Sequence, residues 1–190
     1  MQNKTTNEFD KSLTYEEVKI YIQKNEEILL PFYANETDAG MDVRASEDFL
    51  IAPGQTIVVK TGLKIAIPEG FEIQVRPRSG CSLKTPLRVA NAPGTVDAGY
   101  RDEVGIIITN TSKDYYWDEN DNIKKIPNTE EYTFGIDTKG NKDGYYLIKK
   151  GDRIAQLVLC KIFKAIPEIC EDVSIIGKNR GGGFGHSGTN

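Results

Sequence analysis

The chain has 190 residues, with 24 Lys and Arg against 28 Asp and Glu and a formal net charge of −4. This length suits one domain with a substantial core, and the acidic balance disfavours nonspecific binding to nucleic acid or to an anionic membrane. No run of about 18 apolar residues predicts a membrane-spanning helix, and the polar start MQNKTTNEFDKS lacks the apolar centre of a signal peptide. We therefore expect a single cytoplasmic domain over residues 1–190.

Cysteine and histidine usage narrows the chemistry further. Cys81, Cys160 and Cys170 form no Cys-x-x-Cys pair, so neither a disulfide framework nor a zinc knuckle is expected. His186 has no Cys or second His near it in the sequence, which argues against a histidine metal site and a histidine-dependent nucleophile. Ser79 therefore lacks an evident base, and a turn hydroxyl is its better interpretation.

Short apolar runs between Gly and Pro turns predict strands rather than long helices. The runs cover residues 57–59, 63–67, 71–75, 104–109 and 154–163. The turns are expected at 53–54, 68–70, 79–80, 93–94 and 150–152. One short helical turn is predicted near Ser82, to be ended by Pro86. The spacing favours an all-β barrel or sandwich.

Two segments look added to this core. Residues 1–17 form a polar extension, and about 111–148 form an insertion rich in Asn, Asp, Lys, Gly and Tyr. Turn signals between 138 and 144 separate the apolar stretches 132–134 and 145–148, which predicts a β-hairpin excursion. Tyr115, Tyr116 and Trp117 suggest a contact surface, either for another protein or for packing back onto the barrel.

The arginines indicate where an anion would bind. All seven lie outside the extension and the insertion, where the cations are lysines. The planar guanidinium suits bidentate binding of phosphate or carboxylate, and five of the seven lie beside Gly-rich or Pro-Gly turns whose N–H groups also bind anions. Structural ion pairs would explain some of these arginines, but they do not explain why all seven lie outside the extension and the insertion. The common phosphate loops G-x-x-x-x-G-K-[ST] and G-x-G-x-x-G are absent from the sequence.

Asp97 precedes the apolar run 104–109 and by its local sequence alone is a turn residue. Five short motifs change this interpretation. They are AGMDVRA at 39–45, RPRSG at 76–80, GTVDAGYR at 94–101, GDRIAQLV at 151–158 and RGGGFGHSG at 180–188. In this order they resemble the five motifs of the trimeric deoxyuridine triphosphatases (dUTPases). The resemblance covers about residues 18–109 and from 149 to the last residue of the sequence.

The resemblance implies a jelly-roll-like distorted barrel with a flexible C-terminal arm at about 177–190. It also implies a homotrimer with shared active sites that hydrolyses dUTP to dUMP and pyrophosphate, with Mg²⁺ bound through the substrate phosphates. In that scheme Asp97 activates the water that attacks the α-phosphorus. The reaction limits uracil incorporation into DNA and supplies dUMP for dTMP synthesis.

The resemblance further assigns substrate-binding residues. Arg78, Ser79 and Gly80 would form the phosphate loop, with Gln156 in the same polar cluster. Backbone groups between Asn91 and Val96, including Gly94 and Thr95, would read the uracil edge, and unpaired groups would make a wrong base costly. Tyr100 would pack on the deoxyribose and exclude a 2′-hydroxyl.

Two more sets of residues complete the implied site. In the arm, Arg180 would reach the terminal phosphate, and Phe184, followed by Gly185, would stack on uracil. Asp42 would shape the sugar and metal surroundings, the alternative being a loop Asp that caps a turn. The family pattern usually has one more residue between Arg180 and Phe184, and His186-Ser187 replaces its usual Ser-Thr pair.

The sequence leaves two other functions open. A dCTP deaminase of related fold would carry a Ser-x-x-Ala-Arg motif and a Glu base, which RPRSG at 76–80 and Asp97 fit less well. A noncatalytic dUTP-binding regulator would act through the insertion, although an intact Asp97, Ser79 and Gln156 argue against a dead enzyme.

Overall fold

The computed structural model describes residues 16–179 and residue 181. Short strands dominate it, and its three helical segments are brief: α1 (Ser79–Lys84) and two 3₁₀ turns, Glu130–Tyr132 and Val173–Ile175. None of the helices among the described residues is long and apolar enough to cross a bilayer. The predicted all-β class is confirmed, and so is a short helical segment around Ser82, which begins at Ser79 and ends before Pro86.

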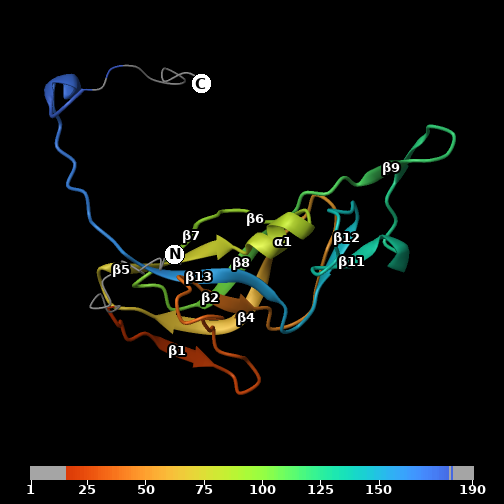
Figure 1. Cartoon of the computed structure of the whole chain (residues 1–190), viewed down its shortest axis with the longest axis horizontal. Helices are drawn as coiled ribbons and strands as arrows, with labels where there is room; N and C mark the ends of the chain where they lie inside the picture. Colours follow the sequence, from red (N-terminus) through yellow and green to blue (C-terminus); the bar gives the residue numbers. More distant parts are fainter. Residues whose placement is uncertain (1–15, 180, 182–190) are drawn as a thin grey trace, which may run out of the picture.

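Two four-stranded sheets form the body of the barrel (Figure 1). The first has the order β1 (Tyr21–Lys24), β4 (Thr56–Ala66), β8 (Glu103–Asn110) and β6 (Leu87–Val89). The second has the order β2 (Met41–Arg44), β13 (Arg153–Lys161), β5 (Phe71–Pro77) and β7 (Gly94–Asp97). All of these neighbouring pairs are antiparallel.

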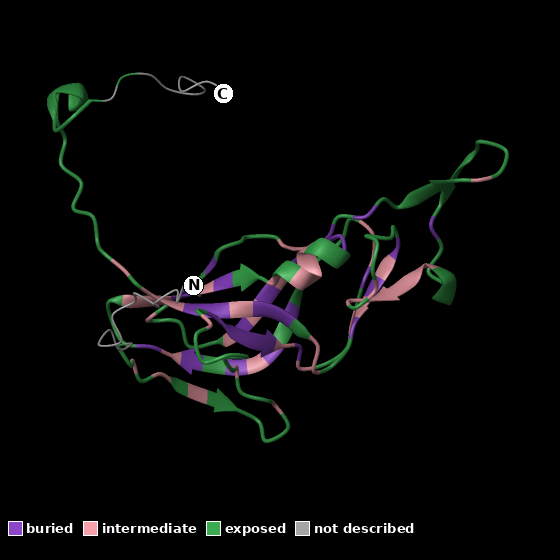
Figure 2. Cartoon of the chain, viewed as in Figure 1, coloured by how far each residue is buried: buried purple, intermediate pink, exposed green. Residues whose placement is uncertain are grey.

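The core forms where the alternating apolar side chains of these strands meet. In β8 every second residue is buried, which is the pattern of a strand with one face against a core. One cluster takes Val59 and Ile106 from the first sheet and Ile73 and Leu157 from the second. Figure 2 shows most buried residues in these central strands, while the projecting β9–β10 hairpin and the segment after β13 are mostly exposed. The two runs predicted at 57–59 and 63–67 belong to one strand, β4, whose pairing with β8 shifts between Lys60 and Lys64.

The insertion contributes two smaller sheets. β9 (Tyr115–Trp117) and β10 (Ile123–Lys125) form an antiparallel hairpin that projects from the barrel (Figure 1). β11 (Thr133–Gly135) pairs with β12 (Tyr145–Ile148), which also pairs with β3 (Phe49–Ile51) and so joins the insertion to the barrel.

The hairpin predicted around residues 138–144 is wrong in detail. Its flanking strands do pair, but in parallel, with Thr133 opposite Tyr145. Local turn signals do not specify the direction in which the chain re-enters a sheet. Here the antiparallel place beside β12 is occupied by β3, and β11 lies on the other edge. The hairpin of the insertion is instead β9–β10.

The aromatic residues of the hairpin are partly packed and partly exposed. The rings of Tyr116 and Tyr132 stack with their centroids 5.6 Å apart. Trp117 remains 61% exposed. Lys113 Nζ also lies 5.8 Å from the centroid of the Tyr115 ring, so two of the three predicted contact residues have partners within the insertion. A protein partner at this surface stays a prediction.

Beyond β13 the chain leaves the barrel as an extended segment (Figure 1). Several of its large apolar side chains are exposed, among them Phe163, Ile166 and Ile169. The predicted arm residues Arg180, Phe184 and Gly185 lie outside the described residues.

Candidate active site

A buried carboxylate organises one end of the second sheet. Asp42 lies on β2, where its side chain is 4% exposed. Arg78 Nε donates to Asp42 Oδ1 over 2.9 Å, and Arg153 Nη1 donates to Asp42 Oδ2 over 3.0 Å. The interpretation of Asp42 as a loop residue that caps a turn is therefore wrong, because it is a strand residue that holds two guanidinium groups.

The pairing of the strands explains why these groups meet. β13 lies between β2 and β5, and Gln156 stands opposite Asp42 on one side and Arg76 on the other. Arg78 follows the end of β5, and Arg153 begins β13. The predicted neighbours Gln156 and Arg78 therefore come from adjacent strands at the same end of the sheet.

A cationic cavity of about 320 Å³ opens beside this cluster. Its charged lining residues are Arg44, Arg78, Lys84, Asp137, Asp152 and Arg153. Arg44 Nη1 donates to Gly151 O over 2.6 Å, and its buried Nε has no hydrogen-bond partner among the described residues. Four cations against two lining carboxylates and the buried Asp42 leave a net positive charge, which favours an anionic ligand, and arginine geometry favours phosphate.

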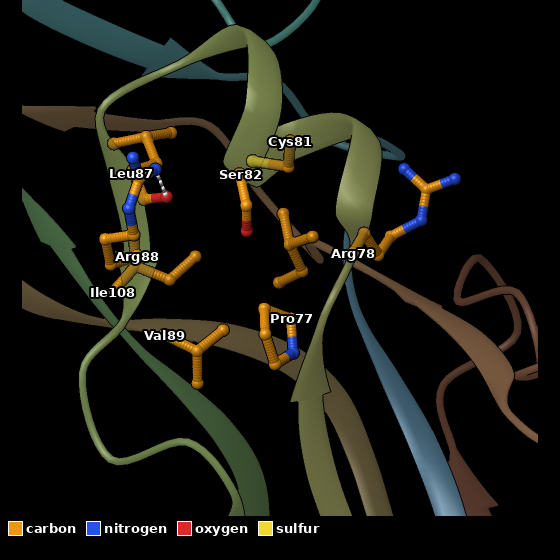
Figure 3. A pocket seen from close by; sticks show the side chains of 9 residues that line it. Pro77, Arg78, Cys81, Ser82, Leu87, Arg88, Val89 and Ile108 are labelled. Atoms are coloured by element: carbon orange, nitrogen blue, oxygen red, sulfur yellow. Dashed lines mark hydrogen bonds between the residues drawn. The ribbon is translucent and has the colours of Figure 1, made fainter. Parts of the chain in front are cut away.

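The predicted phosphate loop borders the same cavity. Gly80 lines it, and Ser79, which is exposed, opens α1 directly after Arg78. α1 packs closely on β6. The cavity that remains between them has a volume of only about 10 Å³ and is lined by Pro77, Cys81, Leu87 and Val89 (Figure 3). Burial raises the pKa of the Cys81 thiol, which argues against a reactive thiolate beside the loop at neutral pH. All three cysteines are free, as the sequence predicts.

A second cavity, of about 180 Å³, contains the predicted base-binding residues. Asn91, Gly94, Thr95, Val96 and Tyr100 all line it. Its walls are completed by residues of β5 and β8: Val75, Val104, Gly105 and Ile107. The structure thus brings together the five residues of segment 91–100 that the family resemblance assigns to the base and sugar, whereas Asp42 lies outside this cavity and Phe184 outside the described residues.

Two contacts shape this second cavity. A Cβ on Gly94 would lie 3.0 Å from Asn91 Nδ2 and 3.3 Å from Val75 Cβ, so a side chain there would force its neighbours to move. The Tyr100 hydroxyl donates to Glu103 O over 2.9 Å, which fixes the ring at the rim of the cavity. A rigid pocket of this kind can select a flat ring by shape and by backbone hydrogen bonds.

Asp97 and the phosphate loop lie far apart within one chain. Asp97 pairs with Glu72 near the start of β5, whereas Arg78 follows the end of that strand. At the usual rise of a β-strand, the two backbone positions are separated by about 20 Å. Asp97 is exposed, and the described residues provide it with no side-chain hydrogen bond. One chain therefore does not bring its own Asp97 to its own phosphate loop.

Sequence reasoning missed some residues of the cationic cavity. Arg153 stands inside the quoted motif GDRIAQLV, but only the pairing of β2 with β13 shows that it binds Asp42. Ile136 and Asp137 also line the cavity and come from the insertion, where no sequence signal indicated them.

The chain is thus an all-β barrel with a small cavity beside β7 and a separate cavity rich in arginine. A family model described as dUTPase matches residues 26–126. The deoxyuridine 5'-triphosphate nucleotidohydrolase of Clostridium tetani is 38% identical over 173 residues, which cover 90% of this chain and 96% of that protein. The enzyme of the same name from Zymomonas mobilis is 39% identical, covering 83% of this chain and 87% of the relative.

Solved structures agree with these relatives. A mutant of the Staphylococcus bacteriophage 80alpha dUTPase with dUpNHpp has a TM-score of 0.73 and 30% identity, covering 90% of this chain and 98% of that one. The dUTPase from phage phi11 of S. aureus, described as showing a species-specific insert, has a TM-score of 0.62 and 28% identity, covering 81% and 97%. The chain belongs to the dUTPase family.

Proposed function

We propose that this protein is a dUTP diphosphatase that converts dUTP and water into dUMP and pyrophosphate. The main observation that supports this proposal is a cavity in a chain of the dUTPase family, lined by Asn91, Gly94, Thr95, Val96 and Tyr100. Its size and its mixture of apolar and polar lining residues suit a uracil ring next to a deoxyribose. In a cytoplasmic setting, the reaction would keep uracil out of DNA and supply dUMP for dTMP synthesis.

Asp97 is the residue we assign as general base. It is exposed at the end of β7, next to the base cavity, so it can accept a hydrogen bond from a water molecule. Its carboxylate would hold and deprotonate the water that attacks the α-phosphorus, and pyrophosphate would leave with the electrons of the broken P–O bond. Arg78 and Arg153, fixed by Asp42, would stabilise the negative charge on the departing group.

Mg²⁺ fits this site through the substrate rather than through a protein cage. No group of three or more His, Cys, Asp or Glu side chains among residues 16–179 is placed to hold a metal, and the phosphate cavity is lined mainly by cations. The metal would be held by phosphate oxygens and would supply charge neutralisation there. A phage phi11 dUTPase mutant is described as coordinating a structural Mg(II) ion.

A homotrimer with shared sites accounts for two features of the chain. The first is the separation of Asp97 from Arg78 along β5. The second is the extended segment after β13, where Phe163, Ile166 and Ile169 remain exposed in the isolated chain and would be covered by a neighbouring copy. Asp97 of one subunit would then act on a nucleotide whose phosphates bind the Arg78 loop of another.

Mixing two inactive variants tests this assembly. Asp97→Asn and Arg78→Ala subunits, unfolded and refolded together in equal amounts, should regain about a quarter of wild-type activity, because each shared site draws independently on two subunits. Activity that stays at the level of the separate variants would show that each site uses one chain alone. Mass measurement in solution gives the number of subunits directly.

Replacement of the proposed base tests the reaction itself. Asp97→Asn should lower kcat about 10²- to 10⁴-fold, while dUpNHpp still binds, because the amide cannot accept the proton. Asp102→Asn, a change at a nearby exposed carboxylate, is the matched control and should keep full activity. Normal pyrophosphate release by Asp97→Asn would exclude this residue as the base. Ammonia release from dCTP would instead support a deaminase.

A second function, binding of a protein partner through the insertion at 111–148, is supported by the projecting β9–β10 hairpin and its exposed Trp117. The similar phage 80alpha dUTPases are described as controlling the transfer of virulence genes. Replacing residues 115–125 by a short Gly-Ser turn should leave dUTP hydrolysis intact, because the hairpin lines neither cavity of the site. A loss of hydrolysis would show that the hairpin is not a separate binding module.

A further inference from the structure

We propose that loop 136–144 of the insertion is a structural part of the phosphate site, and that Asn141 is a positioning residue for α1. The helix begins with Ser79 and Gly80, the predicted phosphate loop. This inference rests on the proposed dUTP hydrolysis and assigns the insertion a role in substrate affinity.

The first observation is that α1 depends on outside partners. It has six residues, and a helix of that length is not stable by itself in water. Its last carbonyl groups have no partner within the helix and need donors from elsewhere. The carbonyl of Cys81 accepts hydrogen bonds from Thr85 N over 3.0 Å and from Thr85 Oγ1 over 2.8 Å.

Asn141 supplies donors to two of the other carbonyls at this end of the helix. Its backbone N donates to Lys84 O over 3.0 Å, and its side-chain Nδ2 donates to Leu83 O over 3.3 Å. Its φ of 48° places the backbone in the left-handed region, which Asn tolerates better than most residues. The insertion therefore donates two hydrogen bonds to the last turn of the helix that carries the phosphate loop.

The loop that bears Asn141 is itself fixed to the barrel. The buried Asn110 donates from Nδ2 to Gly144 O over 2.8 Å, and Ser112 Oγ donates to the same carbonyl over 3.0 Å. The hydroxyl of Tyr146, a fully buried residue, donates to Lys142 O over 3.1 Å. Because both the base and the tip of the loop are hydrogen-bonded, it can transmit a fixed position from the barrel to α1.

The same loop reaches the phosphate cavity directly. Ile136 and Asp137 line it together with Arg78, Gly80 and Arg153. Figure 1 shows α1 on the side of the barrel where β11 and β12 lie. The insertion thus contacts the site at two places: it forms part of the cavity wall, and it supports the helix that forms another part. Substrate affinity should therefore depend on Asn141, although it does not touch the substrate.

Two substitutions and a matched control test the role of Asn141. Asn141→Gly keeps the left-handed backbone and its N–H bond but removes the side-chain donor, and Asn141→Asp also places a carboxylate against the carbonyl of Leu83. Asp121→Gly changes the other left-handed non-glycine residue of the insertion, which lies in the β9–β10 turn. All three are compared in the full chain with Mg²⁺.

We expect Asn141→Asp to raise both the KM for dUTP and the Kd for dUpNHpp about 3- to 10-fold, the worth of one lost hydrogen bond, with kcat within about twofold. Asn141→Gly should show a smaller rise, and Asp121→Gly none. Backbone amides of residues 79–84 should exchange hydrogen faster in Asn141→Asp than in the control.

Three results would overturn or redirect the proposal. Unchanged KM, Kd and hydrogen exchange in Asn141→Asp would refute it. A lower Tm and a lower active fraction with an unchanged KM would show a purely structural role, which also refutes it. If the wild-type protein itself neither binds dUpNHpp nor hydrolyses dUTP, the proposed function fails. Hydrogen exchange at residues 79–84 would still decide whether Asn141 holds α1.

Discussion

Asp42→Asn is the substitution whose effect the structure defines most sharply. The carboxylate is 4% exposed and accepts two short hydrogen bonds, 2.9 Å from Arg78 and 3.0 Å from Arg153. An Asn side chain keeps one acceptor but turns a donor toward the second guanidinium. Hydrogen bonds to charged groups contribute about 1.5–3 kcal/mol each, and breaking a buried pair costs about 3–5 kcal/mol.

Solvent reduces this cost at the arginine end of the pair. The side chains of Arg78 and Arg153 are 23% and 42% exposed, so water can compensate part of the loss. We therefore expect Asp42→Asn to lower the free energy of unfolding by about 2–4 kcal/mol. For a chain of this size, that corresponds to a fall in Tm of about 5–15 °C.

Urea denaturation of a double-mutant cycle measures the effect. Asp42→Asn combined with Arg153→Met should show a coupling energy of about 1–3 kcal/mol between the two positions. Glu47→Gln is the control, because its ion pair with Lys60 spans 3.8 Å between side chains that are more than half exposed, and it should cost less than about 1 kcal/mol. If Asp42→Asn were as stable as this control, or if the two substitutions were additive, the carboxylate would not organise the arginines.

Three further predictions concern other parts of the chain. Burial raises the pKa of Tyr146 to about 12. The contribution of its neutral phenol to the free energy of unfolding is therefore complete below pH 10 and is lost as the pH rises toward 12. Urea denaturation from pH 8 to 11 should show a smaller fall in the free energy of unfolding for Tyr146→Phe than for the wild type. A Cβ on Gly105 would overlap Cγ1 of Val58, so Gly105→Ala should cost about 1–3 kcal/mol, and Val58→Ala should relieve it in a thermal denaturation series. Removal of residues 180–190 should abolish most turnover without changing Tm, if Arg180 and Phe184 close over the nucleotide as the family resemblance implies; normal rates would contradict that role.

The strands that could be predicted from sequence are those with long alternating patterns. β4, β5 and β8 contain apolar runs in which alternate residues are buried, which is the signal that a half-exposed strand produces, whereas β13 was predicted from its continuous apolar run. β2 and β7 were not predicted because each has four residues. β2 is buried or half-buried throughout and therefore shows no alternation of apolar and polar residues. β7 begins with Gly94 directly after Pro93, and this pair predicted a turn rather than a strand.

The candidate site also has a part that could be predicted from the sequence and a part that could not. The residues between Asn91 and Tyr100 were assigned to one base pocket by the family resemblance, and the structure places them around one cavity. The contacts of Asp42 with Arg78 and Arg153 join residues 36 and 111 positions apart, and only the register of β2, β13 and β5 brings them together. The position of the insertion beside α1 also depends on long-range pairing, through β12 and β3. The roles of Asp97, Ser79 and Gln156 in catalysis and binding stay predictions.

The placement of Asp97 and Arg78 near opposite ends of β5 has a genetic consequence in the proposed trimer. A defective chain that lacks both residues would damage the site to which it lends its carboxylate and the site to which it lends its arginine. One such chain incorporated with two healthy ones would leave roughly one of three sites intact. Coexpression of a doubly substituted copy should therefore reduce cellular activity more than its share of the protein, as a dominant-negative allele does.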